Sequence, residues 1–446
     1  MGNDISQQRW YLLNYADSNF SIKGSPIAGY EFSTTGDASG YKRWWGGRVF
    51  GSYSDWFGAS LNFRDNGEFG DNVNREKFFT PDRGYYNNYS SKDGIEYNDV
   101  RAAINFNWDW GGVSIIKDNF QWGHGKFGQL ILSDNVSSFP RIQLTLKPVP
   151  WLRFYYIHGW LNSLVYDSTA FYYTYVDQAA PSLREYYHDK FIAANMLSID
   201  PWQWLTVSLG NSIIYADRLR PEYFIPFNIF KFMDHNSGRG NVGDGNGQIF
   251  FDIAARYPET FSFYTTFFLE VTQIRNVLEQ DFHNTWFGFT FGGKKVDIIF
   301  DNLDLFIEYT RINPWVYTHR DEVLTYQHIN FPLGHWIGQN ADQFKLQFNY
   351  SFLKGLRIKS FIEWARKGGL KDIYYAYKDK ETEPFLYGPI RKDFRFGIDV
   401  SYEIIHEAFV KGYYQYSKIT DEAEDRTPDY LLGNKHSFGI SLFYGF

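Results

Sequence analysis

Large apolar and polar side chains alternate along much of this chain with a period of two. In residues 344–352 the even-numbered positions are aromatic or aliphatic and the odd-numbered positions are polar. Residues 394–403 repeat the pattern, and residues 436–446 carry it to the terminal Phe446. Side chains of an extended strand point alternately to its two faces, so each segment is predicted to be a strand with one apolar and one polar face.

Such segments, of about 9 to 11 residues as a tilted membrane strand requires, can be placed from end to end of the chain. The expected strands are 20–32, 45–53, 56–64, 98–108, 112–117, 141–147, 151–160, 190–199, 204–215, 248–257, 261–271, 285–293, 303–312, 342–352, 356–364, 392–403, 408–418 and 436–446. We therefore predict an all-β fold, a transmembrane antiparallel β-barrel of about 18 strands. Residues 1–446 form one domain, in which 1–19 are a periplasmic N-terminal segment.

The connections between the expected strands alternate strictly between short and long. The short turns are 54–55, 109–111, 148–150, 200–203, 258–260, 354–355 and 404–407, and the long polar stretches are 66–97, 118–140, 161–189, 216–247, 313–341, 367–391 and 419–435. Outer-membrane barrels have short periplasmic turns and long extracellular loops, so both termini are expected in the periplasm.

Tryptophan supports the same orientation. Five tryptophans lie beside the short turns, namely Trp56, Trp110, Trp151, Trp202 and Trp204. Indole rings collect at membrane interfaces because they combine an apolar body with one polar N–H. These residues are predicted to form a periplasmic aromatic belt.

Composition fits a membrane barrel. Aromatic residues make up 21% of the chain, yet the mean hydropathy is −0.42, as expected for a wall with a greasy outside and a wet inside. A large soluble β-protein is the alternative. The sequence contains no apolar run of the length that a transmembrane helix requires. Met1 to Asn3 do not begin a signal peptide, so the numbering is expected to be that of a mature chain.

The charge and the cysteine content of the chain limit the kinds of partner that it can bind. The chain has no cysteine, and a net charge of −7 without a basic block argues against nucleic acid. The polar faces carry charges of both signs. The main ones are Arg101, Lys345, Arg357, Lys359, Glu363, Arg395 and Asp399. They indicate either a polar channel or, as we prefer, ion pairs between neighbouring strands that fill the interior.

Catalytic and metal motifs are weak. No Gly-x-Ser-x-Gly turn is present, and His319, His328 and His335 share one long loop at irregular spacing. Residues 234–247 are rich in glycine and in oxygen ligands of the kind calcium prefers, but without the EF-hand spacing. We predict a non-enzymatic protein without metal or cofactor.

The long loops are rich in aromatic side chains beside amides and carboxylates. Trp122, Trp315, Tyr317 and Trp336 are examples. Sugars present apolar faces and many hydroxyls, so flat rings next to planar hydrogen-bonding groups favour a glycan site. The alternative is a loop cluster that packs on itself as a lid.

Three motifs resemble one family, the capsule assembly protein Wzi family. They are Trp122 to Asn135 with the following Phe139-Pro140, Asp217-Arg218 with Tyr223 to Phe230, and Asn302 to His319 with the segments up to Asn340. The resemblance extends over residues 119–369. It implies an outer-membrane barrel closed by its loops that acts as a lectin for capsular polysaccharide.

On that basis the expected partners are outer-membrane lipid and surface polysaccharide. The expected glycan-binding residues are Trp122, His124, Asp134, Asn135, Arg218, Tyr223, Asn228, Arg311, Trp315, His319, Tyr326, His335 and Asn340. The first alternative is a porin or specific channel for sugars. The second is an adhesin or a component of a motility or secretion machine, which requires an envelope protein partner.

Overall fold

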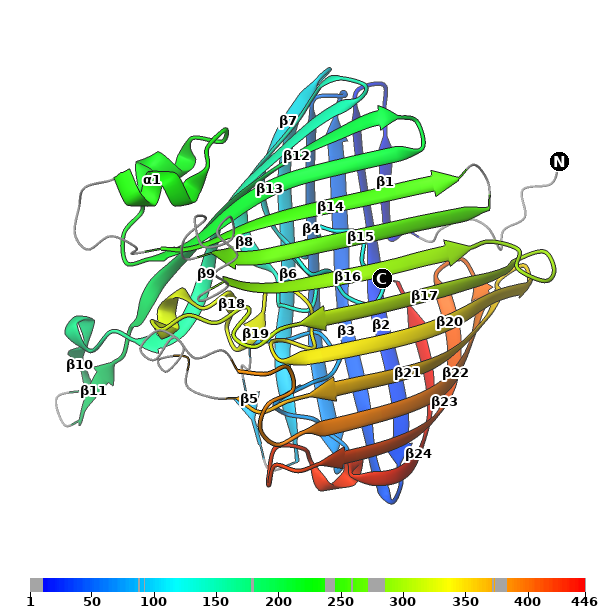
Figure 1. Ribbon diagram of the computed structural model, residues 1–446. Coiled ribbons are helices and arrows are strands. Elements are labelled where there is room, and N and C mark those ends of the chain that lie inside the picture. Colours follow the sequence, from blue (N-terminus) through cyan, green and yellow to red (C-terminus); the bar gives the residue numbers. More distant parts are fainter. Residues whose placement is uncertain are drawn as a thin grey trace.

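The computed structural model describes residues 11–445 except 87–88, 92, 178–179, 237–244, 258–259, 272–284, 371–372 and 374–382. Within this part of the chain, eighteen antiparallel strands form a closed barrel (Figure 1). The barrel strands are β2 (Phe20–Thr35), β3 (Ala38–Tyr53), β4 (Phe57–Gly70), β6 (Gly94–Trp108), β7 (Gly111–Asp118), β8 (Phe139–Val149), β9 (Leu152–Tyr166), β12 (Tyr187–Trp202), β13 (Leu205–Ala216), β14 (Asn246–Tyr257), β15 (Phe261–Val271), β16 (Thr285–Lys295), β17 (Leu303–Ile312), β20 (Ala341–Leu353), β21 (Leu356–Lys367), β22 (Arg391–Ile405), β23 (Ala408–Asp421) and β24 (Gly433–Tyr444).

The eighteen predicted strands are all confirmed, and each of them overlaps one barrel strand. Several are longer than expected, up to 16 residues in β2, β3 and β12. The last strand closes the barrel by pairing with the first, with Phe32 opposite Ile440. Two short additions extend the same sheet, β1 (Leu13–Ala16) and β5 (Tyr89–Ser90). Phe446 lies outside the described residues.

The predicted faces are confirmed. In β24, Phe438, Ile440 and Leu442 are 55–60% exposed on the outer wall, whereas Ser437 and Ser441 are buried on the inner side. The five belt tryptophans are 49–58% exposed beside the short turns. The outer wall thus presents an apolar surface that membrane lipid must cover.

The expected strict alternation of connections is wrong at one place. Strands β2 and β3 are joined by Gly36-Asp37, a two-residue turn at the same end as the long connections. Gly36 adopts a φ of +58°, which a glycine reaches without strain. The expected strands end at residue 32 and begin at residue 45. In the structure both extend into the polar residues 33–44 until only the two-residue turn remains between them.

Two long connections fold into the barrel. We call residues 119–138 and 313–340 the plug. Their apolar side chains form one cluster with inward-facing wall residues such as Ile192 and Phe268. The two segments are tied together, since Ser133 N–H donates to the Leu333 carbonyl at 2.7 Å and Tyr326 OH donates to the Ile131 carbonyl at 3.0 Å. The plug contains the small strands β18 (Gln327–His328) and β19 (Phe331–Pro332) and the 3-10 helix Glu322–Leu324.

Charged side chains of the wall form hydrogen bonds with the plug backbone. Glu308 of β17 accepts from the N–H groups of Lys126 and Phe127, at 2.6 and 3.2 Å. The Lys367 ammonium of β21 donates to the Ile337 carbonyl at 3.0 Å. Plug and wall therefore interact through charge-assisted hydrogen bonds as well as apolar contact.

A third connection folds down the outside of the barrel. We call residues 217–236 the strap; it contains the 3-10 helix Pro221–Phe224 and helix α1 (Phe230–Asn236), and α1 lies outside the wall in Figure 1. A separate apolar cluster joins the strap to the outward faces of β9, β12 and β13. Asn195 of β12 faces outward and donates to the carbonyls of Pro226 and Asn228, both at 2.7 Å. The strap thereby satisfies a polar side chain on a membrane-facing wall.

The remaining described elements are the hairpin β10 (Tyr172–Asp177) and β11 (Ala180–Arg184) and the 3-10 helices Ser168–Ala170 and Asp429–Leu431. Among the described residues, no helix is both long and apolar enough to cross a bilayer.

Candidate functional site

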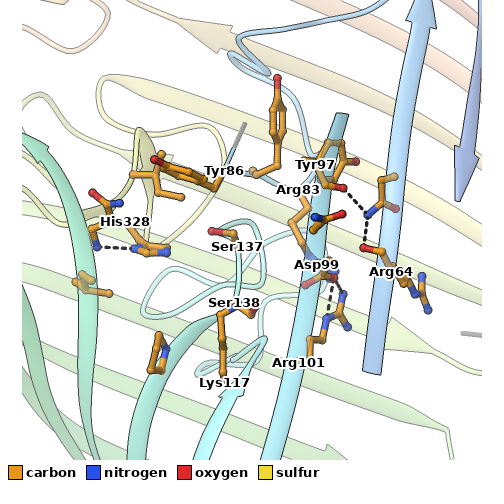
Figure 2. Close-up of a pocket in the computed structure, with 18 of the residues that line it drawn as sticks. Arg64, Arg83, Tyr86, Tyr97, Asp99, Arg101, Lys117, Ser137, Ser138 and His328 are labelled. Atoms are coloured by element: carbon orange, nitrogen blue, oxygen red, sulfur yellow. Dashed lines mark hydrogen bonds and ion pairs between the residues drawn. The ribbon is translucent and has the colours of Figure 1, made fainter. Parts of the chain in front are cut away.

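A cavity of about 560 Å³ lies inside the barrel near the ends of β4, β6, β7 and β8 that lead to the long connections. Its wall comes from these strands and from β9, and its cover comes from residues 83–86, 137–138 and 328–329. Figure 2 shows these side chains around one space. The volume falls within the range of about 300–1,000 Å³ that is typical of small-ligand sites.

The cavity is rich in positive charge. Arg64, Arg83, Arg101 and Lys117 line it, against the single carboxylate of Asp99. Arg101 donates to Asp99 through Nε at 2.9 Å. Lys117 instead donates to a neutral acceptor, the Val100 carbonyl, at 2.8 Å.

Arg83 and Arg101 meet at one side-chain amide. With its oxygen turned toward them, Asn119 accepts from Arg83 Nη1 at 2.9 Å and from Arg101 Nη1 at 3.0 Å. Two guanidinium groups therefore approach one neutral oxygen, although like charges repel. Each arginine also has a carboxylate neighbour, Asp134 for Arg83 at 3.2 Å and Asp99 for Arg101.

Tyrosine rings stand beside these cations. Tyr85 stacks on Tyr97 with ring centroids 4.6 Å apart, and both hydroxyls are engaged, with the Arg75 carbonyl and with Glu68. Tyr86 is 48% exposed at the cover. The cavity thus contains the stacked pair Tyr85 and Tyr97, whose orientation is fixed by hydrogen bonds, and the accessible ring of Tyr86.

His328 contributes a neutral imidazole. Burial, followed by the charges of Lys190 and Lys117, lowers the pKa of His328 to about 3. Its Nδ1 accepts from the Asn162 N–H at 3.0 Å, so Nε2 carries the proton. The histidine can therefore donate a hydrogen bond without adding charge.

Two further cavities inside the barrel carry charges of both signs. The one against β2, β3 and β20–β24 is lined by six cations and four carboxylates. The buried partners of these side chains add Glu363 and Asp393 on one side and Lys77 on the other, which gives seven cations and six carboxylates. The one near the short turns of β9, β12 and β14 has Arg153 and Arg256 against Asp200 and Asp252. With Asp118 and Asp134 added, the first cavity has four cations against three carboxylates.

Six of the predicted glycan-binding residues are buried. They are Trp122, Asn135, Trp315, Tyr326, His335 and Asn340, with exposed fractions of 0–7%. Their expected role as an accessible glycan surface is corrected, because the side chains are used in the packing of the plug. Tyr317, for example, stacks on Tyr326 with centroids 5.6 Å apart. The alternative, a loop cluster packed on itself, describes this part of the molecule.

Three other predicted residues lie on the strap. Tyr223 is fully buried there and donates to Asp234 at 3.1 Å, while the Asn228 carbonyl accepts from the wall and Arg218 is exposed. They sit outside the wall, apart from the predicted residues of the plug. The packing of the strap against the wall explains why these residue types occur in this segment.

The last four predicted residues are scattered. Asp134 pairs with Arg83 beside the cavity, whereas His124 pairs with Asp252 in the cavity near the short turns. Arg311 lies 3.8 Å above the Phe385 ring. His319 accepts from the Asp321 N–H at 3.1 Å. Only Asp134 therefore adjoins the cation-rich cavity.

The charges predicted on the inner faces are mostly paired across neighbouring strands. Lys345 and Arg395 both contact Glu363, at 2.8 and 3.1 Å, and Lys359 contacts Asp399 at 3.5 Å. Arg357 is exposed near the turn after β20. These contacts agree with our interpretation of the inner charges as ion pairs.

Residues 234–247 and the three histidines of the long loop are the weak candidates for metal binding in the sequence. Most of residues 234–247 lies outside the described residues. In the part of the chain that the structure describes, no group of three or more histidine, aspartate or glutamate side chains is arranged to hold a metal ion.

Several residues of the cavity were not predicted. Arg83, Tyr86, Lys117, Ser137 and Ser138 come from loops or strand ends without a local motif. The only signal was the inward position of Arg64 and Arg101 in neighbouring strands, which indicates proximity but not a shared cavity.

The closed barrel, its apolar outer wall and its internal plug define the class of protein. It is an outer-membrane β-barrel whose lumen is filled by its own connections. Residues 103–430 match the family model described as capsule assembly protein Wzi. The chain belongs to the Wzi family and is a multi-pass protein of the outer membrane.

Solved structures share the fold. The Escherichia coli protein described as Wzi, an outer-membrane protein involved in group 1 capsule assembly and a carbohydrate-binding β-barrel, is 14% identical with a TM-score of 0.55. The match covers 95% of this chain and 84% of that one. Acinetobacter baumannii OccAB2 is 10% identical with a TM-score of 0.50 and coverages of 94% and 98%. No curated protein sequence matches this chain.

Proposed function

We propose that this barrel binds surface polysaccharide at the extracellular end and holds it there without catalysis. The observation that carries the proposal is the cation- and tyrosine-lined cavity between the wall and the packed plug. A saccharide can lie against the accessible ring of Tyr86 while its hydroxyls accept from the arginines and the imidazole. Membership of the Wzi family supports this role, because its Escherichia coli structure is described as carbohydrate-binding.

A binding measurement tests the proposal. The surface polysaccharide of the source bacterium is labelled and titrated with the detergent-purified barrel. We expect saturable binding that the Tyr86→Ala variant weakens about tenfold, since stacking of a flat ring is lost. The matched control is Tyr257→Ala, a 73% exposed tyrosine at the opposite end of the barrel. Absence of saturable binding to the wild-type barrel would refute the proposed function.

A sugar channel is the second candidate, because three cavities of 540–560 Å³ remain inside the barrel. Planar-bilayer recording distinguishes the two. A plug held by wall carboxylates predicts little steady conductance, and sustained single-channel currents in the wild-type protein would favour the channel. An adhesin or machine component would instead co-purify with a stable envelope protein.

A further inference from the structure

A groove of about 500 Å³ lies on the outer wall, between the strap and the outward faces of β8, β9, β12, β13 and β14. Phe227, Asn228 and Ile229 form its strap side. Its wall side is mostly aliphatic, with Leu146, Pro148, Leu152, Leu197, Leu209 and Ile249. The groove is separate from the saccharide cavity, which lies inside the barrel.

We propose that this groove binds one acyl chain of a glycerophospholipid whose headgroup stands at the periplasmic interface. The outer wall of this outer-membrane protein is the face that lipid covers. The groove is continuous with that face, since Leu197 and Leu209 in its lining are 40% and 57% exposed there. Hydrocarbon is therefore the medium that reaches it.

The polar groups of the wall at this groove are already engaged. Asn195 Nδ2 donates to the carbonyls of Pro226 and Asn228, both at 2.7 Å. Asn195 Oδ1 accepts from Asn211 Nδ2 at 2.7 Å, and Asn211 Oδ1 accepts from the Phe230 N–H at 2.9 Å. An occupant that needs hydrogen bonds would lose them here at a cost, whereas a hydrocarbon chain needs none.

The groove has the width of a single chain. Its lining crosses five neighbouring strands, which corresponds to a length of about 20 Å at the usual strand spacing of about 4.8 Å. A volume of about 500 Å³ over that length gives a width of about 6 Å. An α-helix with its side chains is about 10–12 Å across, so a helix of a partner protein does not fit.

The groove rises from the periplasmic end of the barrel. Pro148 lies beside the short turn between β8 and β9, and Leu152 follows the belt tryptophan Trp151. At its other end, Ile249 stands about 20 Å above Tyr257, the last residue of β14, for a rise of about 3.3 Å per residue and a tilt of about 40°. The strap covers the wall on the extracellular side, so the chain enters from the periplasmic leaflet.

Packing explains why a chain would stay in the groove. Lipid tails are as apolar as leucine, so hydrocarbon gains little hydrophobic free energy by leaving the bilayer. In the groove, however, it contacts wall and strap on several sides, and an unfilled groove loses these dispersion contacts. Phe227 stacks on Phe154 with ring centroids 4.4 Å apart, which fixes one side of the groove.

Native mass spectrometry tests the proposal. The full chain is reconstituted into vesicles of phosphatidylethanolamine and lipid A, extracted with a mild detergent and analysed for bound lipid. We expect one phosphatidylethanolamine molecule to stay with each barrel. Retention of lipid A alone would mean entry from the extracellular leaflet, and a dimer without lipid would assign the groove to a second copy. Either result, or a barrel without bound lipid, would overturn the proposal.

Variants that fill the groove locate the lipid. Leu209→Trp should lower the retained fraction at least tenfold, because the larger side chain occupies the space of the acyl chain. The matched control is Leu442→Trp, at a 60% exposed position on the outer wall of β24. Resistance to SDS checks folding, and Leu197→Trp on the neighbouring strand gives the same test if Leu209→Trp does not fold. Equal retention by the groove variant and the control would overturn the assignment.

Discussion

At the residue scale, the plug depends on glycines that leave space for aromatic rings. A Cβ at Gly334 would lie 2.2 Å from the Tyr317 hydroxyl oxygen and 2.6 Å from the Leu130 carbonyl oxygen. The Tyr317 ring is fixed by its hydrogen bond to the same carbonyl, so neither neighbour can withdraw easily. The contact joins the two segments of the plug.

We therefore predict that Gly334→Ala loosens the plug by about 1–3 kcal/mol, as overpacking of a closed core does. Limited proteolysis of the folded barrel should cut within residues 313–340 at least several times faster. The control is Gly412→Ala in β23, where the nearest atom to the added Cβ is 3.8 Å away. Equal protection of both variants would contradict the packing described for Tyr317.

At the element scale, the plug contains neutral histidines. Burial lowers the pKa of both His335 and His328 to about 3. An unfolded plug would take up protons near the ordinary histidine pKa of about 6.5, whereas the folded plug does not until about pH 3. The free energy of plug unfolding therefore decreases as pH falls through this window.

The expected result is an acid-sensitive plug in an acid-resistant barrel. Planar-bilayer conductance should increase reversibly between pH 7 and pH 4, because released loops open the lumen. A His328→Gln, His335→Gln double variant should show a smaller increase, since neither amide titrates. If conductance is equal at both pH values in wild type, the histidines do not control the plug.

The strap is the second element whose attachment can be tested. Asn195 pairs across the β12–β13 ladder with Asn211, and Asn211 Oδ1 accepts from the Phe230 N–H at 2.9 Å. These two side chains connect the strap backbone to the wall. Ile225, Phe227 and Ile229 expose 48–69% of their surface beyond it, so the strap presents an apolar outer surface of its own.

Asn195→Ala should loosen the strap at a cost of about 1–3 kcal/mol, because the Pro226 carbonyl loses its donor and the Asn228 carbonyl keeps only Asn211. Trypsin cleavage after Arg218 should accelerate while the barrel stays resistant to SDS. Ser208→Ala, on the inner face of the neighbouring strand, serves as the control. Unchanged cleavage in the asparagine variant would argue against a wall-bound strap.

At the scale of the whole molecule, the barrel is stable only with an apolar solvent around it. Ile440 is 60% exposed on the outer wall of the closing strand. Ile440→Arg should destabilise the barrel in lipid by up to about 2–4 kcal/mol, the cost of a cation near the bilayer centre. Reversible guanidinium unfolding in lipid vesicles measures it. Gln415→Arg, which points into the barrel, should cost clearly less; equal costs would mean that the faces are misassigned.

Strands, faces and belt were determined by the sequence alone, because strand formation and membrane exposure follow from a local period of two. For residues such as Ile440 and Trp202, the neighbouring residues in the sequence are enough to predict that the side chain lies on the outer wall. The short length of the turns likewise predicted that they lie together at one end of the barrel. Even the departure at Gly36-Asp37 extends strands that were already correctly located.

Only the tertiary structure decided where the long connections go. Trp122 and Tyr223 both belong to aromatic loop motifs, yet one packs inside the barrel and the other on its outer wall. The sequence could not distinguish them, because loop destination depends on which distant wall offers matching polar groups. The cation-rich cavity has the same origin: Arg64, Arg83, Arg101 and Lys117 are brought together by strand pairing and by a folded loop. A site assembled from such separated segments leaves no local pattern, since the close approach of its charges exists only after the barrel closes.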